Sequence, residues 1–330
     1  MAEPEKAPLR SAYLDNAKFL LIACVAIGHA IGPVLHRGGW LRTLYVFIHT
    51  FHIPVFVFIA GYFSRPVNSP EYLKKNLNHL IAPLLTFHVL YNLILTRPLG
   101  KSFDWAYFFV EPYFGLWFLL SLFYWRMLLL WIATVRHLVF RAVATGVMAG
   151  YIPAMERAFS LARTFTLLPF FTAGYALRNI PIEERLTAPV ARVAGAITLA
   201  WGLYLTAAWP SADEQWLYGC YPYAALGVAG MQAAFAKVFV YGINAAMGAA
   251  FLTVVPKRRT FFSEWGSRSL YIYVLHIPLV KLAKALGFYK SMDGLGGEIM
   301  IPLGALLAVA LLSTRAVRDR TKSLIEPRWF

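Results

Sequence analysis

The sequence predicts an all-α integral membrane protein, a polytopic bundle of about ten transmembrane helices with both termini in the cytoplasm. Hydrophobic residues make up 59% of the 330-residue chain, charged residues make up 14%, and the mean hydropathy is +0.57. A soluble domain contains roughly 45–50% apolar and about 25% charged residues. Apolar runs of about 17 to 25 residues, long enough to cross the hydrocarbon core, recur along the chain. A bilayer is therefore the expected solvent for this protein.

Ten apolar runs follow one another in order along the chain. The expected spans are residues 16–36, 43–63, 78–96, 115–135, 137–153, 164–178, 189–209, 232–255, 268–287 and 299–315. The polar stretches between them are too short to fold separately. We therefore expect one membrane domain over residues 1–330, without a soluble accessory domain.

The basic residues predict the orientation of this bundle. With the N-terminus in the cytoplasm, nineteen Lys and Arg residues lie on the inner side, nine lie on the outer side and three lie within spans. Such an excess is typical of cytoplasmic loops, so both ends are expected in the cytoplasm. The protein is expected in the plasma (inner) membrane of a bacterium. This topology and contact with anionic lipid head groups account for the net charge of +15, so no nucleic acid partner is expected.

The first expected span, which we interpret as a membrane helix and not as a cleavable signal, carries a lysine and a histidine. Lys18 and His29 lie eleven residues apart, and eleven steps of 100° end within about 20° of a whole number of turns. Both side chains therefore share one face, with His29 about 16 Å deeper than Lys18. Asp15 is expected to pair with Lys18 at the inner mouth. An ionisable group costs roughly 2.5–3.5 kcal/mol at a helix centre on insertion scales, so this stripe predicts a functional site.

Histidines form the second unusual set of residues. Six of the eight lie in or at the edge of expected spans, namely His29, His49, His52, His79, His88 and His276. His49 and His52 are three residues apart and are expected to share a helical face. Antiparallel packing of the first two spans would bring His29 and His52 to a similar depth, where they could bracket one reaction centre. Hydrogen bonding between helices is the alternative role for such histidines, and no metal site is expected, because no carboxylate partner accompanies them.

Several short segments, in order along the chain, match the motifs of a known family. They are Asp15 and Lys18 with His29, His52-Ile53-Pro54-Val55-Phe56, Ala60-Gly61-Tyr62-Phe63, Leu116-Trp117-Phe118-Leu119, Pro169-Phe170-Phe171 with Gly174-Tyr175, and Ser269-Leu270-Tyr271-Ile272-Tyr273 with His276. With these segments the chain resembles the membrane acyltransferase-3 superfamily, and within it the branch of fucose 4-O-acetylase and other polysaccharide O-acetyltransferases. Ala60 stands where serine is usual in the family, and Lys74 and Lys75 replace a pair of arginines.

The resemblance implies a membrane O-acyltransferase. Such an enzyme moves an acyl group, with acetyl as the expected one, from acyl-CoA to a hydroxyl of a sugar, a cell-surface polysaccharide or a glycolipid. His29 would act at the thioester, assisted by Lys18, Asp15 and His52. It would serve either as general base for the acceptor hydroxyl or as the nucleophile that takes the acyl group, and the sequence leaves both roles open. Acetyl-CoA would be a donor substrate, so no permanently bound cofactor is expected.

Both substrates have expected binding residues. Acyl-CoA is anionic and cytoplasmic, so its nucleotide end is expected near Arg65, Lys74 and Lys75, although lysine lacks the bidentate fork of arginine. The acceptor is expected at two outer loops in which aromatic rings stand beside carboxylates, a combination that suits a sugar. These loops are residues 104–117, with Trp105, Glu111 and Trp117, and residues 209–223, with Glu214, Tyr218 and other aromatic residues. An interfacial aromatic belt would give the same composition.

Two other classes of function are compatible with buried histidines. A proton-coupled transporter would use them as a proton relay, and a non-catalytic partner in glycan export would use them for helix packing. The sequence has no internal inverted repeat and few carboxylates within its spans, which argues against the transporter. The expected partners are therefore membrane lipids, acyl-CoA and a glycan acceptor, and the sequence carries no signal for an oligomeric state.

Overall fold

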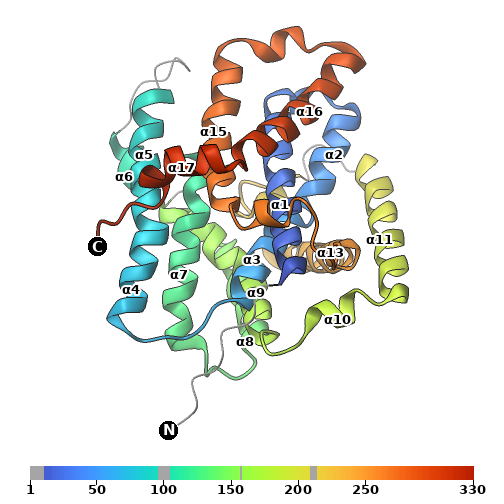
Figure 1. The fold of residues 1–330 in the computed structure, drawn as a ribbon. Helices are drawn as coiled ribbons and strands as arrows, with labels where there is room; N and C mark the ends of the chain where they lie inside the picture. The colour runs from blue at the N-terminus through green and yellow to red at the C-terminus, as the bar shows by residue number, and fades with distance from the viewer. Residues whose placement is uncertain (1–10, 96–104, 157, 209–213) are drawn as a thin grey trace.

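The computed structural model describes residues 11–95, 105–156, 158–208 and 214–330 (Figure 1). These residues form helices and their connections, without a β-strand. The helices are α1 (Ala12–Ile31), η1 (Gly32–Arg37), α2 (Gly39–His49), α3 (His52–Tyr62), α4 (Pro70–Asn76), η2 (Leu77–Ile81), α5 (Ala82–Leu95), α6 (Trp105–Val110), η3 (Phe114–Leu116), α7 (Trp117–Ile132), α8 (Leu138–Ala149), η4 (Pro153–Met155), η5 (Ala158–Ser160), α9 (Leu161–Ala176), α10 (Ile182–Leu186), α11 (Pro189–Ala207), α12 (Gln215–Tyr218), α13 (Gly230–Val254), α14 (Ser263–Gly266), α15 (Ser269–Ala285), η6 (Phe288–Ser291), α16 (Gly294–Leu312) and α17 (Arg315–Ile325). The expected all-α class is confirmed.

Six stretches among the described residues are long and apolar enough to cross a membrane. They are Ala12–Arg37, Gly39–Tyr62, Phe108–Ile132, Pro189–Ala207, Gly230–Val254 and Gly294–Leu312, and each overlaps one of the expected spans. The other four expected spans coincide with the shorter helices α5, α8, α9 and α15, of 14, 12, 16 and 17 residues. These helices support a multi-pass membrane protein. The count of ten and the cytoplasmic termini stay predictions.

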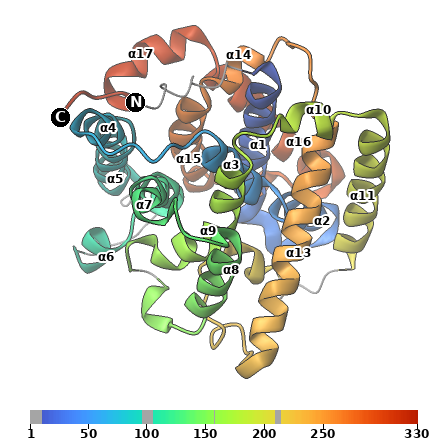
Figure 2. The ribbon, with the colours of Figure 1, turned by 90° about the horizontal axis from the view of Figure 1, so that it is seen from below.

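Helix α1 runs through the bundle and defines its two sides. It packs against α2, α3, α14, α15 and α16, and Figure 2 shows it among these helices. At its beginning, the Ser11 hydroxyl donates to Glu183 at 2.8 Å and the Asn16 amide donates to the carbonyl of Pro256 at 2.9 Å. Beyond its end, the guanidinium of Arg37 donates to the carbonyl of Tyr289 at 2.8 Å. We call these the start side and the end side of α1.

Two glycines let α3 and α9 cross in close contact. A Cβ atom on Gly61 would lie 2.0 Å from the carbonyl oxygen of Phe171, and a Cβ atom on Gly174 would lie 2.0 Å from that of Phe58. Only a residue without a side chain fits at such a distance, and small residues are the usual means of bringing membrane helices together. The glycines of two of the motif segments therefore pack the scaffold.

The second expected span is broken between its two histidines. Phe51 has φ −137° and ψ −29°, so α2 ends at His49 and α3 begins at His52. The Thr50 hydroxyl donates to the carbonyl of Phe47 at 2.7 Å, a local bond that competes with continued helix. The expectation that His49 and His52 share one helical face is therefore wrong. Their rings nevertheless meet edge to face, with centroids 4.6 Å apart.

Candidate active site

His29 in the last turns of α1 is hydrogen-bonded to a histidine of another helix. Its Nδ1 atom lies 2.8 Å from Nε2 of His276 in α15, and the two rings stack with centroids 5.0 Å apart. His276 is buried, with 2% of its surface exposed, and its own Nδ1 atom lies 2.8 Å from the carbonyl oxygen of Ile272. The chain thus forms a relay of three groups between α1 and α15.

The hydrogen bonds of the relay determine which nitrogen of a neutral His29 ring carries the proton. A carbonyl oxygen only accepts, so Nδ1 of His276 carries the proton that it donates to Ile272. In the neutral ring, Nε2 of His276 is then an acceptor, and Nδ1 of His29 must donate to it. Nε2 of His29 is left with its lone pair, which is the form that a general base or a nucleophile needs.

Two nearby histidines are bound differently. The Nδ1 atoms of His49 and His52 lie 2.7 Å and 2.8 Å from the carbonyl oxygens of Tyr45 and Ile48, each four residues earlier in the chain. Each ring is therefore held by the backbone that precedes it, whereas His29 is held by a side chain from α15. This difference singles out His29 as the histidine whose orientation depends on the assembled bundle.

His88 has a structural role in the connection that leads to η3. Its Nε2 atom donates to the carbonyl of Phe108 at 2.9 Å, and its Nδ1 atom accepts from the backbone N–H of Tyr113 at 2.9 Å. Both ring nitrogens are therefore used to fix backbone groups. For this residue, hydrogen bonding to a neighbouring segment accounts for a histidine in an apolar span.

Three elements close around His29. The ring of Phe114 lies 4.9 Å from it, and a Cβ atom on Gly115 would lie 3.6 Å from its Cε1 atom. One residue earlier on α1, a Cβ atom on Gly28 would lie 3.2 Å from Cε1 of His49. The direct hydrogen bond of His29 goes to His276, a partner that sequence reasoning did not place in the site.

Lys18 and Asp15 form an ion pair on the start side. The Nζ atom of Lys18 lies 2.6 Å from Oδ1 of Asp15, and it also lies 5.8 Å from the ring centroid of Phe63. The backbone of Asp15 packs closely against α14. A Cβ atom on Gly266 would lie 1.8 Å from the Asp15 carbonyl oxygen. Along the helix, this pair is about 16 Å from His29, so Lys18 and His29 share a face without touching.

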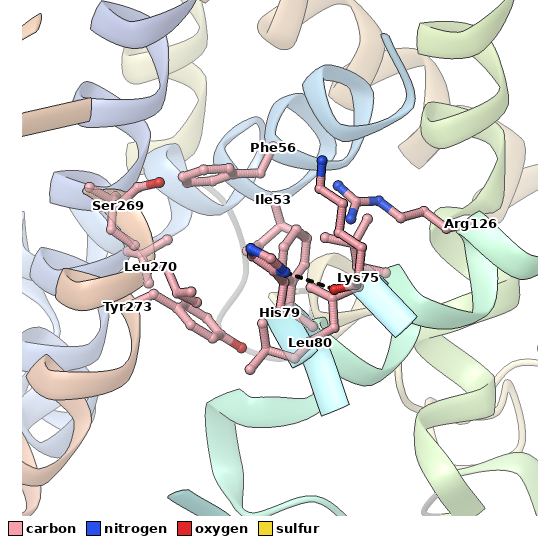
Figure 3. Close-up of a pocket in the computed structure, with 14 residues that line it drawn as sticks. Ile53, Phe56, Lys75, His79, Leu80, Arg126, Ser269, Leu270 and Tyr273 are labelled. Atoms are coloured by element: carbon pink, nitrogen blue, oxygen red, sulfur yellow. Dashed lines mark hydrogen bonds between the residues drawn. The ribbon is translucent and has the colours of Figure 1, made fainter. Parts of the chain in front are cut away.

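The face of α1 between Lys18 and His29 lines a cavity. Ile22 and Val25 follow Lys18 by four and seven residues, which places them on the same face. Both belong to the wall of an apolar cavity of about 350 Å³ (Figure 3). The remaining lining residues are Ile53, Phe56, Lys75, His79, Leu80, Phe118, Leu119, Leu122, Arg126, Ser269, Leu270 and Tyr273. Tyr273 donates a hydrogen bond to the carbonyl of Gly115, so the cavity wall is bonded to the loop that borders His29.

Cationic groups gather in one part of this cavity. Figure 3 shows the side chains of Lys75 and Arg126 ending near each other, with the ring of His79 beside Lys75. Arg126 donates to Oδ1 of Asn76 at 2.8 Å, and Nδ1 of His79 lies 2.7 Å from the carbonyl oxygen of Lys75. The described residues that line the cavity include no carboxylate. The arrangement suits a ligand with an anionic head and a thin uncharged arm.

The three expected donor-binding residues occupy different positions. Lys75 lines the cavity, Lys74 is exposed on α4, and Arg65 is half-buried in the connection between α3 and α4. Arg126, one of the three basic residues that lie within the expected spans, joins Lys75 there. The sequence signal for Arg126 is a guanidinium inside an apolar span. The free energy of inserting such a group into a membrane alone makes it a functional candidate.

A second, polar cavity of about 500 Å³ lies on the start side. It is lined by Ala12, Asp15, Arg259, Ser263, Glu264, Ser267, Arg268, Tyr271, Arg318 and Glu326. Three arginines face three carboxylates there, and Arg268 already bonds Glu264 at 2.9 Å and the Ser313 carbonyl at 2.7 Å. Because these charges offset one another, an anionic ligand is better matched by the cavity at Lys75 and Arg126.

The two outer loops expected to bind the acceptor are linked through Arg163. Its guanidinium lies 5.0 Å from the ring centroid of Trp117, and its Nε atom donates to the carbonyl of Tyr218 at 3.4 Å. Trp105 is exposed on α6 and stacks on its own helix, whereas Glu111 is partly buried before η3. Arg163 thus joins residues near 117 to residues near 218 on the end side.

Comparison with known proteins gives one match. A family model described as an acyltransferase domain matches residues 11–314. No curated protein and no solved structure matches the chain. The matched region runs from the beginning of α1 to the end of α16, so it contains the relay at His29 and the cavity beside it.

Proposed function

The chain belongs to the membrane acyltransferase-3 superfamily, and from that premise we propose that it is an O-acyltransferase that moves an acetyl group from acetyl-CoA to a hydroxyl of a sugar, a polysaccharide or a glycolipid. The observation that carries the proposal is the position of His29. Its Nε2 atom keeps a free lone pair, and the residue lies four positions beyond Val25, which lines a cavity with cationic groups. Four residues of α-helix correspond to about 6 Å.

The proposed donor route begins on the start side, which we propose faces the cytoplasm of a bacterium. The phosphates of acetyl-CoA would bind Lys75 and Arg126, where charge-assisted hydrogen bonds are available to them. The uncharged arm would lie along Ile22 and Val25 in the apolar cavity. The thioester would then reach His29 from the start side, while the acceptor hydroxyl approaches from the end side.

The proposed general-base reaction involves two proton transfers. Nε2 of His29 takes the proton of the acceptor hydroxyl as its oxygen forms a bond to the acetyl carbonyl carbon. The carbon–sulfur bond breaks, and the coenzyme A thiolate takes the proton from the His29 imidazolium. The same Nε2 atom also suits a covalent route, in which it attacks the thioester carbon and the carbon–sulfur bond breaks to release the coenzyme A thiolate. The acceptor oxygen then displaces the imidazole, and the hydroxyl proton passes to the thiolate.

The test of this proposal is transfer by the purified full chain. Labelled acetyl-CoA is supplied with a panel of p-nitrophenyl glycosides and polysaccharides, and wild type is expected to form labelled ester. His29→Ala should abolish transfer, whereas His36→Ala, which changes an exposed histidine of η1, should not. A rapid quench without acceptor separates the routes, because only the covalent route leaves label on the protein. Absence of transfer by wild type, with His29-dependent proton or glycan movement in vesicles, would instead establish the transporter.

A further inference from the structure

Helix α2 carries a polar face that leads from the end side toward His29. Arg42, Tyr45 and His49 stand at positions i, i+3 and i+7, so they lie on one side of the helix. Seven residues correspond to about 10 Å of depth. This face approaches the reaction centre from the opposite direction to the face of α1 that carries Lys18.

Aromatic and hydroxyl contacts continue this face inward. The rings of Tyr45 and His49 stack with centroids 3.9 Å apart, and the Tyr45 hydroxyl donates to the Tyr218 hydroxyl at 3.0 Å. The ring of Tyr218 also meets His49 edge to face, with centroids 5.6 Å apart. At its inner end, His49 lies against Gly28, the residue before His29. Polar groups thus extend from the outer end of α2 to the neighbourhood of the reactive histidine.

At the outer end, Arg42 and Glu214 are buried together without completing their hydrogen bonds. The Nε atom of Arg42 lies 3.6 Å from Oε2 of Glu214, and the two side chains are 14% and 15% exposed. Nε and Nη2 of Arg42 and Oε2 of Glu214 are three of the five buried side-chain atoms in the described chain that have no hydrogen-bond partner. Buried polar groups are nearly always bonded, and an unbonded one costs about 1–3 kcal/mol. Because part of each side chain remains exposed, a molecule that reaches the pair meets both a hydrogen-bond donor and an acceptor.

The charges of the pair select the class of that molecule. An anion would be repelled by Glu214, and a cation would be repelled by Arg42. Neighbouring hydroxyls on a neutral ring satisfy both, because each hydroxyl oxygen accepts from the guanidinium and each hydroxyl hydrogen is donated to the carboxylate. The aromatic rings of Tyr45 and Tyr218 add apolar surface for a sugar ring on the inner side of the pair.

Resting on the proposed function, we propose that Arg42 and Glu214 form the acceptor-binding subsite and hold two neighbouring hydroxyls of a neutral sugar. A further hydroxyl of the same sugar then points along Tyr45 and His49 toward His29. Glu214 belongs to the second of the two loops expected to bind the acceptor, and Arg42 on α2 adds a partner from outside both loops. Acceptor selection is thereby placed at the beginning of α2, where Arg42 lies.

The experiment uses the purified full chain, labelled acetyl-CoA and the p-nitrophenyl glycoside that wild type acetylates best. Glu214→Gln and Arg42→Lys are expected to raise the acceptor KM at least tenfold. The KM for acetyl-CoA should rise far less than the acceptor KM, because the proposed donor site at Lys75 and Arg126 is untouched. Asp293→Asn is the matched control, since Asp293 pairs with Arg37 at 3.2 Å on the same side but is 77% exposed. An unchanged acceptor KM, or an equal rise in the KM for acetyl-CoA, would overturn the subsite.

A binding measurement separates this inference from the proposed function. Saturation-transfer NMR detects contact of p-nitrophenyl glycosides with the protein without any reaction. Wild type and Asp293→Asn are expected to give a signal that Glu214→Gln loses at an unchanged melting temperature. Binding without transfer would defeat the proposed function and leave the subsite standing, whereas equal binding by Glu214→Gln would defeat the subsite alone.

Discussion

The relay at His29 predicts a specific loss when its partner is removed. In His276→Ala, Nδ1 of His29 loses the acceptor that lies 2.8 Å away, and the ring is free to turn or to move its proton to Nε2. A ring with a proton on Nε2 has no lone pair there to act on a hydroxyl or a thioester. The variant is therefore expected to lose rate in the chemical step, with little change in the KM for acetyl-CoA.

The magnitude follows from the hydrogen bond that is lost. A typical bond contributes about 0.5–1.5 kcal/mol net, and a buried donor left without a partner costs about 1–3 kcal/mol. Since each 1.36 kcal/mol of barrier is a factor of ten in rate, kcat should fall by about 10- to 100-fold. This is smaller than the loss expected for His29→Ala, because the reactive nitrogen is still present.

The assay is steady-state transfer of labelled acetyl, with kcat and KM measured separately. His276→Gln should recover part of the lost rate, because a Gln amide oxygen reaches a position similar to that of Nε2 and accepts from His29. His88→Gln is the matched control, since it changes a histidine whose nitrogens bond Phe108 and Tyr113. Wild-type kcat in His276→Ala at equal folded protein, or a glutamine variant no better than the alanine one, would refute the relay.

Three further substitutions probe the donor cavity and the scaffold. Arg126→Gln should raise the KM for acetyl-CoA about tenfold in the transfer assay, because a charge-assisted bond is worth about 1.5–3 kcal/mol, while Lys74→Gln, outside the cavity lining, should raise it less than twofold. Val25→Trp fills part of the 350 Å³ cavity and should lower transfer at least tenfold, and normal transfer by it would exclude the proposed donor route. Gly61→Ala should lower the melting temperature, because its Cβ would lie 2.0 Å from a carbonyl oxygen of α9, whereas Gly242→Ala meets nothing within 4 Å and should leave it unchanged or higher.

The sequence predicts best what depends on spacing along one helix. The shared face of Lys18 and His29 and the ion pair of Lys18 with Asp15 follow from helical periodicity, and α1 has both. The all-α class follows equally directly, because composition and apolar run length report the solvent. These features need only short-range geometry, which a single sequence contains.

Contacts between distant segments were not predictable in this way. The bond between His29 and His276 joins residues 247 positions apart, and nothing in local periodicity selects one distant histidine over another. The break at Thr50 was missed for a different reason, since an apolar run predicts a continuous helix and a single hydroxyl bond to Phe47 does not alter its hydropathy. The position of the Arg126 guanidinium beside Lys75 depends on how α4 and α7 pack, which the pattern along one helix does not contain.

The distribution of the proposed site residues along the chain bears on acceptor choice. His29 and Arg42 belong to one continuous segment, residues 12–62, whereas their partners His276 and Glu214 are attached to other helices. The proposed relay and the proposed acceptor subsite are therefore each assembled from two parts of the chain, and each has one part in this segment. Replacing the short segment at α12 alters the environment of an incoming sugar without moving any atom of the relay. In this architecture, a change at α12 alters what an incoming sugar meets while His29 and His276 keep their hydrogen bond.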